Sequence, residues 1–482
     1  MSTYSTVVAE IHKHSLANLL VDGYYEGDRS LEWASRSKLP PLLQKAQFVV
    51  GWPTTTVDVL HERLDWRKWY ADAKYGLDDV YMDNHLDYES ELGHLDSLLY
   101  GTAFGVVGTG DTKIGEPEIL VTVESAKHMA GIYDRRRRRM SIAASKGYND
   151  AGEWVYGTLY EADQNTYYER NTPTSPWKTI RVDKHNLGRV PVVQFVNRAR
   201  AGRRQGKSEI TRAVRSYTNM AVRTLVGMEV NREFFSSPQR YALGAKEDAF
   251  VDENGQPIPG WKAILGSLWN LERDEEWAEQ HPDSDGLPTI GQFPATSPGP
   301  YIDQIEGLSK MFAAEVGIPP GYLGFVSEQP PSADAIRALE ARLVKRAQRR
   351  ITSWNMGWTE VGQIVAMLKT GDYPAAKDIV NEWGDPAVPA TASDTDRAVK
   401  LVGAQIIPAD SSVTQEIVGL SIGQRRQLER DQNRAAVRQL LLGGDDGNGS
   451  PSGDGTQPGA DDGNGSGDGS PNAPVASGGQ SS

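Results

Sequence analysis

Hydrophobic residues recur every three or four positions over several long stretches of this chain, and each stretch predicts an amphipathic helix. The longest begins near residue 333 and continues to 369 without an interrupting proline. About 36 residues at the helical rise span roughly 54 Å, and an average helix has only ~11–12 residues. The apolar positions of this stretch are Ile336, Leu339, Leu343, Ala347, Ile351, Trp354, Trp358, Val361, Val365 and Leu368.

A second helix is predicted just before the long one, from Tyr301 to Val316. Gly317 and the pair Pro319-Pro320 end it, because proline has no amide hydrogen and restricts the residue before it. The chain then turns, and Ser332 is expected to cap the N-terminus of the long helix. The pattern therefore predicts two helices joined by a proline-rich loop.

Helices are also predicted over 4–22, 54–70, 78–100 and 208–235, and small helices over 395–442. Between residues 103 and 197 the hydrophobic period changes from 3.6 to 2, which predicts strands. Their ranges are 103–108, 118–123, 153–160, 166–169 and 190–197. Helices followed by a mostly antiparallel sheet indicate an α+β fold.

The last forty residues, from Gly443 onward, are dominated by Gly, Ser, Asp, Pro and Asn. Such a composition buries too little apolar surface to offset the entropy lost on ordering. The segment 443–482 is therefore predicted to be a disordered C-terminal tail.

Two blocks of sequence, taken in order, resemble a known family. The first is a strand at Val190–Asn197, a basic loop, and a long helix from about Ser208 to Phe235. The second is the helix that ends at Gly317-Ile318-Pro319-Pro320-Gly321-Tyr322-Leu323-Gly324, a loop, and a helix beginning near Ser332-Ala333-Asp334-Ala335. Their order and spacing, over residues 40–370, resemble the portal proteins of long-tailed bacteriophages. Glycine is common in that family where this chain has Ala333.

The resemblance implies a mostly helical portal-type fold with wing, stem, clip and crown regions. It assigns 1–207 to an N-terminal α+β wing domain, 208–239 and 300–317 to two stem helices, and 240–299 to a clip insertion. It assigns 318–333 to a tunnel loop and 334–394 to the long wing helix and the segment after it. Residues 395–442 would form a small helical crown, followed by the tail at 443–482.

The family's function implies a ring of twelve copies at one capsid vertex, with a channel for packaging and ejecting double-stranded DNA. The implied partners are further copies of the chain, double-stranded DNA bound without sequence specificity, the terminase large subunit, the major capsid protein and scaffold, and a head–tail adaptor. The protein would reside in the virion after assembly in the host bacterial cytoplasm, without a membrane. No catalytic residue or cofactor is implied, since the packaging ATPase is a separate motor subunit in that family.

The resemblance also implies two functional surfaces. The tunnel loop would contact DNA through Phe325, Val326, Ser327, Glu328 and Gln329. The clip would face the motor and the adaptor through Trp269, Glu272, Asp274, Glu275 and Glu276.

A run of five arginines, Arg135 to Arg139, follows Tyr133-Asp134 and precedes a strand-like segment, Met140-Ser141-Ile142. Such a run can bind nucleic acid, but few aromatic residues are interleaved with it, as single-strand stacking would require. A solvated turn or a subunit interface with acidic neighbours is the better interpretation of Arg135, Arg136, Arg137, Arg138 and Arg139.

One segment suggests an alternative, a P-loop enzyme that acts on nucleic acid. Ala201-Gly202-Arg203-Arg204-Gln205-Gly206-Lys207-Ser208 lies between a predicted strand and a predicted helix, as a phosphate-binding loop does. Its first position is Ala201 rather than glycine, and no later apolar strand ending in Asp follows to hold magnesium. The preceding sheet also has an antiparallel pattern, whereas nucleotide-binding folds alternate strand and helix. A monomeric scaffold with long helices is a third hypothesis.

Composition narrows the chemistry further. The net charge is −13, and the six aspartates after Gly443 leave −7 for the rest. This balance does not suit a protein that grips DNA through clustered cations; it suits a surface along which DNA slides, and equally a soluble protein. The chain has no cysteine, which excludes disulfides and thiolate metal sites.

Other site classes are not expected. The eight histidines form no His-Glu-x-x-His pattern, so no metal site is expected. No apolar run of about 18 residues occurs, so no transmembrane helix is expected. The first residues lack the pattern of a secretory signal.

Overall fold

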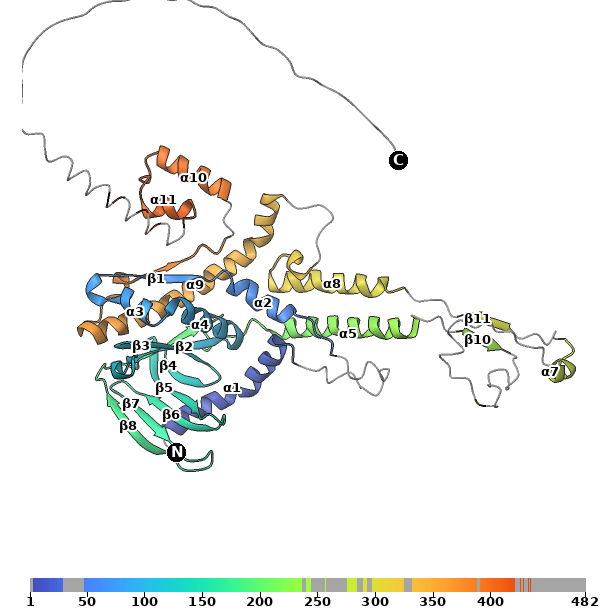
Figure 1. The fold of residues 1–482 in the computed structure, drawn as a ribbon, viewed down its shortest axis with the longest axis horizontal. Coiled ribbons are helices and arrows are strands. Elements are labelled where there is room, and N and C mark those ends of the chain that lie inside the picture. The colour runs from blue at the N-terminus through green and yellow to red at the C-terminus, as the bar shows by residue number, and fades with distance from the viewer. Residues whose placement is uncertain are drawn as a thin grey trace, which may run out of the picture. The chain divides into compact units, whose positions relative to one another are not determined.

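The computed structural model describes residues 3–28, 47–235, 240–243, 256, 275–283, 289–292, 297–324, 332–387, 391–420, 425, 428, 432 and 434. The chain divides into two compact units, Met1–Val388 and Pro389–Ser482. The first is a mixture of helix and antiparallel sheet (Figure 1). The predicted α+β class is therefore confirmed.

A three-stranded antiparallel sheet lies at the centre of the first unit, in the order β3-β2-β9. Its strands are β2 (Thr102–Thr109), β3 (Ile119–Ser125) and β9 (Val192–Val196). Because successive side chains of a strand point to opposite faces, Val106 and Val192 join one core while Val107 and Val193 join another. The sheet therefore separates two hydrophobic cores.

A five-stranded antiparallel meander packs on one face of this sheet. Its strands are β4 (Met129–Asp134), β5 (Arg139–Tyr148), β6 (Trp154–Tyr160), β7 (Gln164–Glu169) and β8 (Lys178–Lys184). Helix α1 (Thr3–Tyr25) covers the far face of the meander, where Tyr4 packs with Ala144 and Leu159. The Tyr4 hydroxyl also donates to the carbonyl of Ser145 at 3.1 Å.

Helices cover the other face of the three-stranded sheet. They are α2 (Trp52–His61), α3 (Leu77–Asp83), α4 (Leu86–Tyr100) and the long α9 (Ala333–Thr370). Short helices η3 (Ala73–Tyr75), η4 (Thr112–Ile114) and η7 (Ala376–Asp378) connect elements, and β1 (Trp66–Tyr70) pairs with β12 (Val380–Trp383). The second unit contains α10 (Thr391–Gly403) and α11 (Ser412–Ile417).

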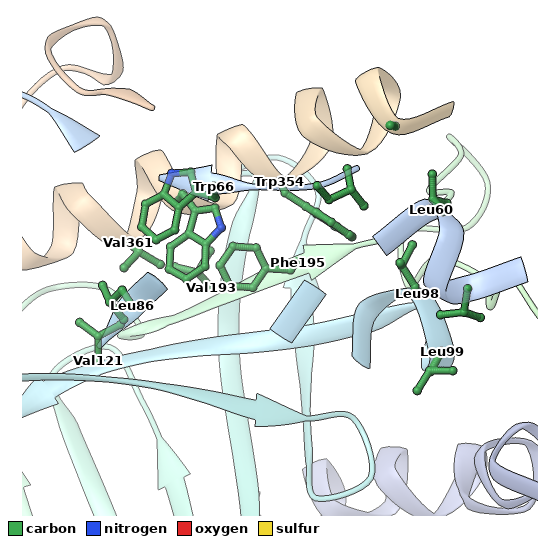
Figure 2. Packing of buried hydrophobic residues seen from close by; sticks show 14 of the residues in the cluster. Leu60, Trp66, Leu86, Leu98, Leu99, Val121, Val193, Phe195, Trp354 and Val361 are labelled. Atoms are coloured by element: carbon green, nitrogen blue, oxygen red, sulfur yellow. The ribbon is translucent and has the colours of Figure 1, made fainter. Parts of the chain in front are cut away.

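Aromatic side chains fill the core between α9 and the sheet (Figure 2). Trp66 stacks on Trp358 with ring centroids 3.9 Å apart, and Phe195 lies 4.6 Å from Trp358. Both tryptophans of α9, Trp354 and Trp358, have no exposed surface. Burial of such large apolar side chains dominates core energetics, so α9 is anchored firmly along its second half.

The polar residue at the centre of this core is His94 of α4. Its ring stacks on Trp354 at 4.4 Å, and its Nε2 accepts a hydrogen bond from the indole N–H of Trp358 at 2.9 Å. Burial, and to a smaller extent nearby His61, lowers the pKa of His94 to about 3. The imidazole is therefore neutral in the folded protein.

Several predicted elements are confirmed. Helices begin at Thr3 and Ala333, and the side chain of Ser332 accepts a hydrogen bond from the amide of Ala335, as the predicted cap requires. The helix before the proline loop, α8 (Gly299–Val316), ends at Gly317 in a left-handed conformation. The tail at 443–482 and most of the predicted helical segment after residue 420 lie outside the described residues.

Other predictions were wrong in detail. The helix predicted over 54–70 ends at His61, and Trp66–Tyr70 is a strand. A register irregularity in β1 places its buried residues, Trp66 and Trp69, three apart. A bulge of this kind imitates a helical period. Strands β4, β8 and β12 were also not predicted as strands.

The helix predicted over 78–100 is two helices that break at Asn84 and His85, where φ of His85 is 49°. The Asn84 side chain donates to the carbonyl of Ile119 and accepts from the amide of Val121, both at the outer edge of β3. The break therefore lets one side chain occupy the free edge of the sheet.

Because folded His94 stays neutral while the unfolded histidine can be protonated, the protein should lose stability in acid. The unfolded histidine has a pKa near 6.5, so below that pH the unfolded state binds a proton that the folded state does not. We expect this residue to cost about 1.4 kcal/mol of unfolding free energy for each pH unit below 6.5. Chemical denaturation of wild type and His94→Gln at pH 7.0, 6.0 and 5.0 tests this, since the variant should lose less stability on acidification. Parallel pH profiles would contradict the expectation.

Candidate functional site: an ion cluster at the base of two antiparallel helices

Helices α5 (Arg212–Phe235) and α8 pack side by side in opposite directions (Figure 1). Tyr217 meets Phe312 near one end, with ring centroids 6.4 Å apart. Near the other end a Cβ on Gly227 would lie only 3.0 Å from the ring of Tyr301. These two helices match the segments predicted as the stem.

The outer ends of the pair lead to the segment predicted as the clip. Within its described part, β10 (Arg240–Leu243) pairs with β11 (Thr289–Gln292), and α7 (Glu275–Gln280) lies between them in sequence. Glu275 begins α7 and is exposed, and Glu276 belongs to the same helix. Trp269, Glu272 and Asp274 lie outside the described residues, so the proposed clip face stays a prediction.

The inner ends of the pair meet a buried carboxylate, Glu209, three residues before α5. Its side chain is 1% exposed and accepts hydrogen bonds from Arg350, from Arg346 at 2.8 Å and from Asn197 at 3.1 Å. Arg198 lies at 3.4 Å. We call these five residues the Glu209 cluster.

Arginines of α9 also hold the C-terminus of α8. Arg342 donates to the carbonyls of Ala314 and Glu315, and Arg346 donates to the carbonyl of Val316. The last carbonyls of a helix have no partner within the helix and carry partial negative charge, so guanidinium groups stabilise them. Helix α9 thus binds the base of both helices of the pair.

Gly317 is required for this arrangement. Its φ of 73° is left-handed, and a Cβ there would lie 2.6 Å from Nε of Arg342. Any other residue would strain the backbone and displace the guanidinium.

The arginines of the cluster stabilise the ionised form of Glu209. Burial raises the pKa of Glu209, but Arg350, Arg346 and Arg198 lower it by more, so the net pKa lies below its ordinary value. The carboxylate is therefore ionised at neutral pH, and several N–H groups satisfy it, as a buried charge requires.

A cavity of about 650 Å³ adjoins the cluster. Its cationic lining residues are Arg198, Arg342, Lys345, Arg346, Arg349 and Arg350, and its acidic ones are Glu209 and Glu315. No nucleophile with an adjacent base lines it. The ion pairs and the helix-end hydrogen bonds make this site a joint between α5, α8 and α9.

The five predicted arginines lie at the turn between β4 and β5. The Asp134 carboxylate accepts from the amides of Arg136 at 2.8 Å and Arg137 at 3.1 Å, which closes the turn. Arg137, Arg138 and Arg139 line a second cavity, of about 920 Å³, together with Arg189 and residues of α9. Sequence alone did not show that this turn reaches α9.

The predicted DNA contacts of the tunnel loop, Phe325–Gln329, lie outside the described residues. The structure describes both of its ends. A short helix, η6 (Pro320–Leu323), follows α8 on one side, and the Ser332 cap begins α9 on the other. Tyr322 donates from its hydroxyl to Glu340 of α9, which ties the first end to the long helix.

The segment Ala201–Ser208 does not have the geometry of a phosphate-binding loop. Two of the amides that would have to face phosphate are occupied, because Arg203 N donates to Arg200 O and Lys207 N donates to Asn197 O. A Cβ on Gly206 would lie 2.0 Å from the carbonyl of Gly101. Glycine is therefore needed here so that the two backbone segments can pack closely. The preceding strand β9 is antiparallel to β2, unlike the parallel strands of nucleotide-binding folds.

Sequence reasoning missed the Glu209 cluster. A usable signal was present, since Arg342, Arg346 and Arg350 are spaced by four and therefore share one face of a helix. A row of arginines on one face of a long helix indicates a buried or partner-bound anion when that face is not exposed to solvent.

Comparison with known proteins agrees with this architecture. The family model described as "Phage portal protein, SPP1 Gp6-like" matches residues 3–415. The portal protein of Mycobacterium phage D29 is 32% identical over 436 residues, covering 87% of this chain and 86% of the relative. That of Mycobacterium phage L5 is 31% identical over 437 residues, with the same coverage of both chains.

Solved structures show a more distant similarity. A chain in the virion of a native gene transfer agent particle is 12% identical, with a TM-score of 0.42, over 84% of this chain and 99% of the other. A chain in the neck of that particle is 14% identical, with a TM-score of 0.41, over 84% and 98%.

Neutralising the buried carboxylate should destabilise the joint. We expect Glu209→Gln to lower the unfolding free energy by about 3–5 kcal/mol, because it leaves buried guanidinium groups without their counter-charge. The matched control is Glu229→Gln, whose partner Arg232 is exposed, and which should cost less than about 1 kcal/mol. Denaturant unfolding at pH 7 measures both. The difference between wild type and Glu209→Gln should shrink as pH falls below 4.5, the ordinary pKa of glutamate, because the unfolded wild type then binds a proton that the folded carboxylate, with its lowered pKa, does not. Equal losses in the two variants would contradict a special role for Glu209.

Proposed function

We propose, because the chain belongs to the SPP1 Gp6-like family of phage portal proteins, that its copies form a closed ring of twelve at one vertex of the capsid. The channel of the ring would conduct double-stranded DNA during packaging and ejection. The observation that carries this proposal is the family match over residues 3–415. The chain would belong to the virion and be assembled in the host bacterial cytoplasm.

The helix pair suits the stem of such a ring. Helices α5 and α8 are clamped at their base by Glu209, Arg342, Arg346 and Arg350, so force applied to their outer ends passes into α9. The outer segment, 240–299, would be the clip that binds the terminase large subunit and later the head–tail adaptor. Trp269, Glu272, Asp274, Glu275 and Glu276 are its proposed contacts.

The tunnel loop would lie between two fixed helix ends. The left-handed cap at Gly317 and the Ser332 cap hold its flanks. We infer that Phe325, Val326, Ser327, Glu328 and Gln329 face the channel. Repeated around a ring they would give an acidic, polar constriction with no cation to hold phosphates, so DNA would slide rather than bind.

The remaining regions complete the proposal. The wing would contact neighbouring copies, the major capsid protein and scaffold, with Arg135–Arg139 as a candidate subunit interface. The helices after 395 would form the crown. We propose no chemical activity and no cofactor for the chain. Among the described residues, no helix is long and apolar enough to cross a membrane, and no group of acidic and histidine side chains is placed to hold a metal.

Closed rings are the first expected result. We expect end-on views of the purified full-length protein, by negative-stain electron microscopy, to show rings with a stain-filled centre. Mass photometry should give a mass near twelve times 52.9 kDa. A single-chain mass at all concentrations, also after co-expression with the phage scaffold, would favour the monomeric scaffold hypothesis instead.

Nucleotide should not bind. The occupied amides of the 201–208 segment predict no saturable heat when Mg-ATP is titrated into the protein by calorimetry, and no difference between wild type and Lys207→Ala. Saturable binding that Lys207→Ala removes would restore the P-loop alternative.

A further inference from the structure

Helices α3 and α4 carry a strongly acidic surface. From Leu77 to Tyr100 the chain has seven acidic residues and no lysine or arginine. Among the described residues, none of the exposed acids on this surface makes an ion pair. We call this surface the acidic face; its exposed acids are Asp78, Asp79, Asp83, Asp87 and Glu91.

Large apolar side chains are exposed on the same face. Met82 and Tyr88 are each 60% exposed and Leu92 is 41% exposed. Met82 lies four residues after Asp78 on α3, and Tyr88 and Leu92 lie four residues apart on α4, so each pair shares one side of its helix. Exposed apolar side chains within a charged surface are typical of a protein–protein interface.

The cavity beside the β4–β5 turn has the complementary composition. Its charged residues are Arg137, Arg138, Arg139, Arg189, Lys377 and Glu360, and Glu360 is already paired with Arg189. The Arg189 side chain is 6% exposed, and its Nε is buried without a hydrogen-bond partner in the described structure. We call this cavity the arginine groove.

The arginine groove also offers apolar contacts. Met356 is 68%, Val380 57% and Tyr373 45% exposed at its lining. A nucleic-acid phosphate would use the cations but leave these side chains uncovered. A protein surface that combines carboxylates with apolar side chains would cover both, and the acidic face is such a surface.

The two surfaces lie at opposite edges of the three-stranded sheet. Asn84, between α3 and α4, bonds the outer edge of β3. Arg189 lies just before β9, the strand at the other edge. One chain therefore carries two different, complementary surfaces, which a heterologous contact that closes into a ring requires.

We propose that the acidic face of one subunit docks in the arginine groove of the next copy, and that this contact joins neighbouring wings. The proposal rests on the proposed ring and names the two surfaces that build it. Arg137, Arg138 and Arg139 would pair with the carboxylates of the acidic face, and Met82, Tyr88 and Leu92 would cover Met356, Val380 and Tyr373.

Charge reversal tests the pairing with the full-length chain. The first variant, Asp83→Arg/Asp87→Arg, reverses the acidic face; the second, Arg137→Glu/Arg139→Glu, reverses the groove. Each alone places like charges at every contact and should reduce the fraction of protein in rings at least about tenfold. The matched control, Lys178→Glu/Lys184→Glu on exposed β8, should assemble like wild type.

Mixing distinguishes pairing from general damage. An equimolar mixture of the two reversed variants should recover rings, because alternating subunits then meet opposite charges at every contact and twelve is an even number. A chain with all four substitutions should recover them too. Ring fractions are measured by mass photometry and end-on electron microscopy.

Each contrary result identifies what has failed. If wild type forms no closed ring, the proposed function fails and this contact fails with it. If wild type forms rings and the reversed variants do so equally well, only the contact is overturned. It is also overturned if neither the mixture nor the four-substitution chain recovers rings. Normal rings from the groove variant with weaker DNA binding would assign the arginines to DNA instead.

Discussion

One buried carboxylate connects the parts of this molecule that must act together. Glu209 follows the sheet and precedes α5, and it is held by two arginines of α9 that lie 137 and 141 residues away in sequence. The neighbouring guanidinium groups of α9 hold the last carbonyls of α8. A buried charge is tolerated only when it is fully paired, so the positions of the sheet, α5, α8 and α9 are interdependent.

Helix α9 links these elements to one another. Its second half is fixed by Trp354 and Trp358 in an aromatic core. Its first half carries the arginines that bind the stem helices and begins at the Ser332 cap beside the predicted tunnel loop. Such a helix is a stiff link, so a displacement of the loop would be transmitted to the wing rather than absorbed locally.

The sequence predicted those features that depend on neighbouring residues. The limits of α9, the Ser332 cap and the glycine that ends α8 follow from side-chain period and capping chemistry, and the structure has them. The strand β1 was mistaken for helix because its bulge gives buried residues a spacing of three and its partner, β12, is more than 300 residues away. The Glu209 cluster was missed for a related reason, since a buried ion pair depends on residues that meet only after folding. The tunnel loop and most of the clip face were inferred from family resemblance and remain predictions.

The side chain of Asn84 affects whether many copies of this protein can assemble without aggregating. An open sheet edge invites backbone pairing with an identical chain, and such pairing leads to irreversible aggregates. Asn84 fills this position on β3 with its own amide group. Association at this edge must then proceed through side chains alone, so a wrongly placed copy can dissociate and try again before a closed assembly forms.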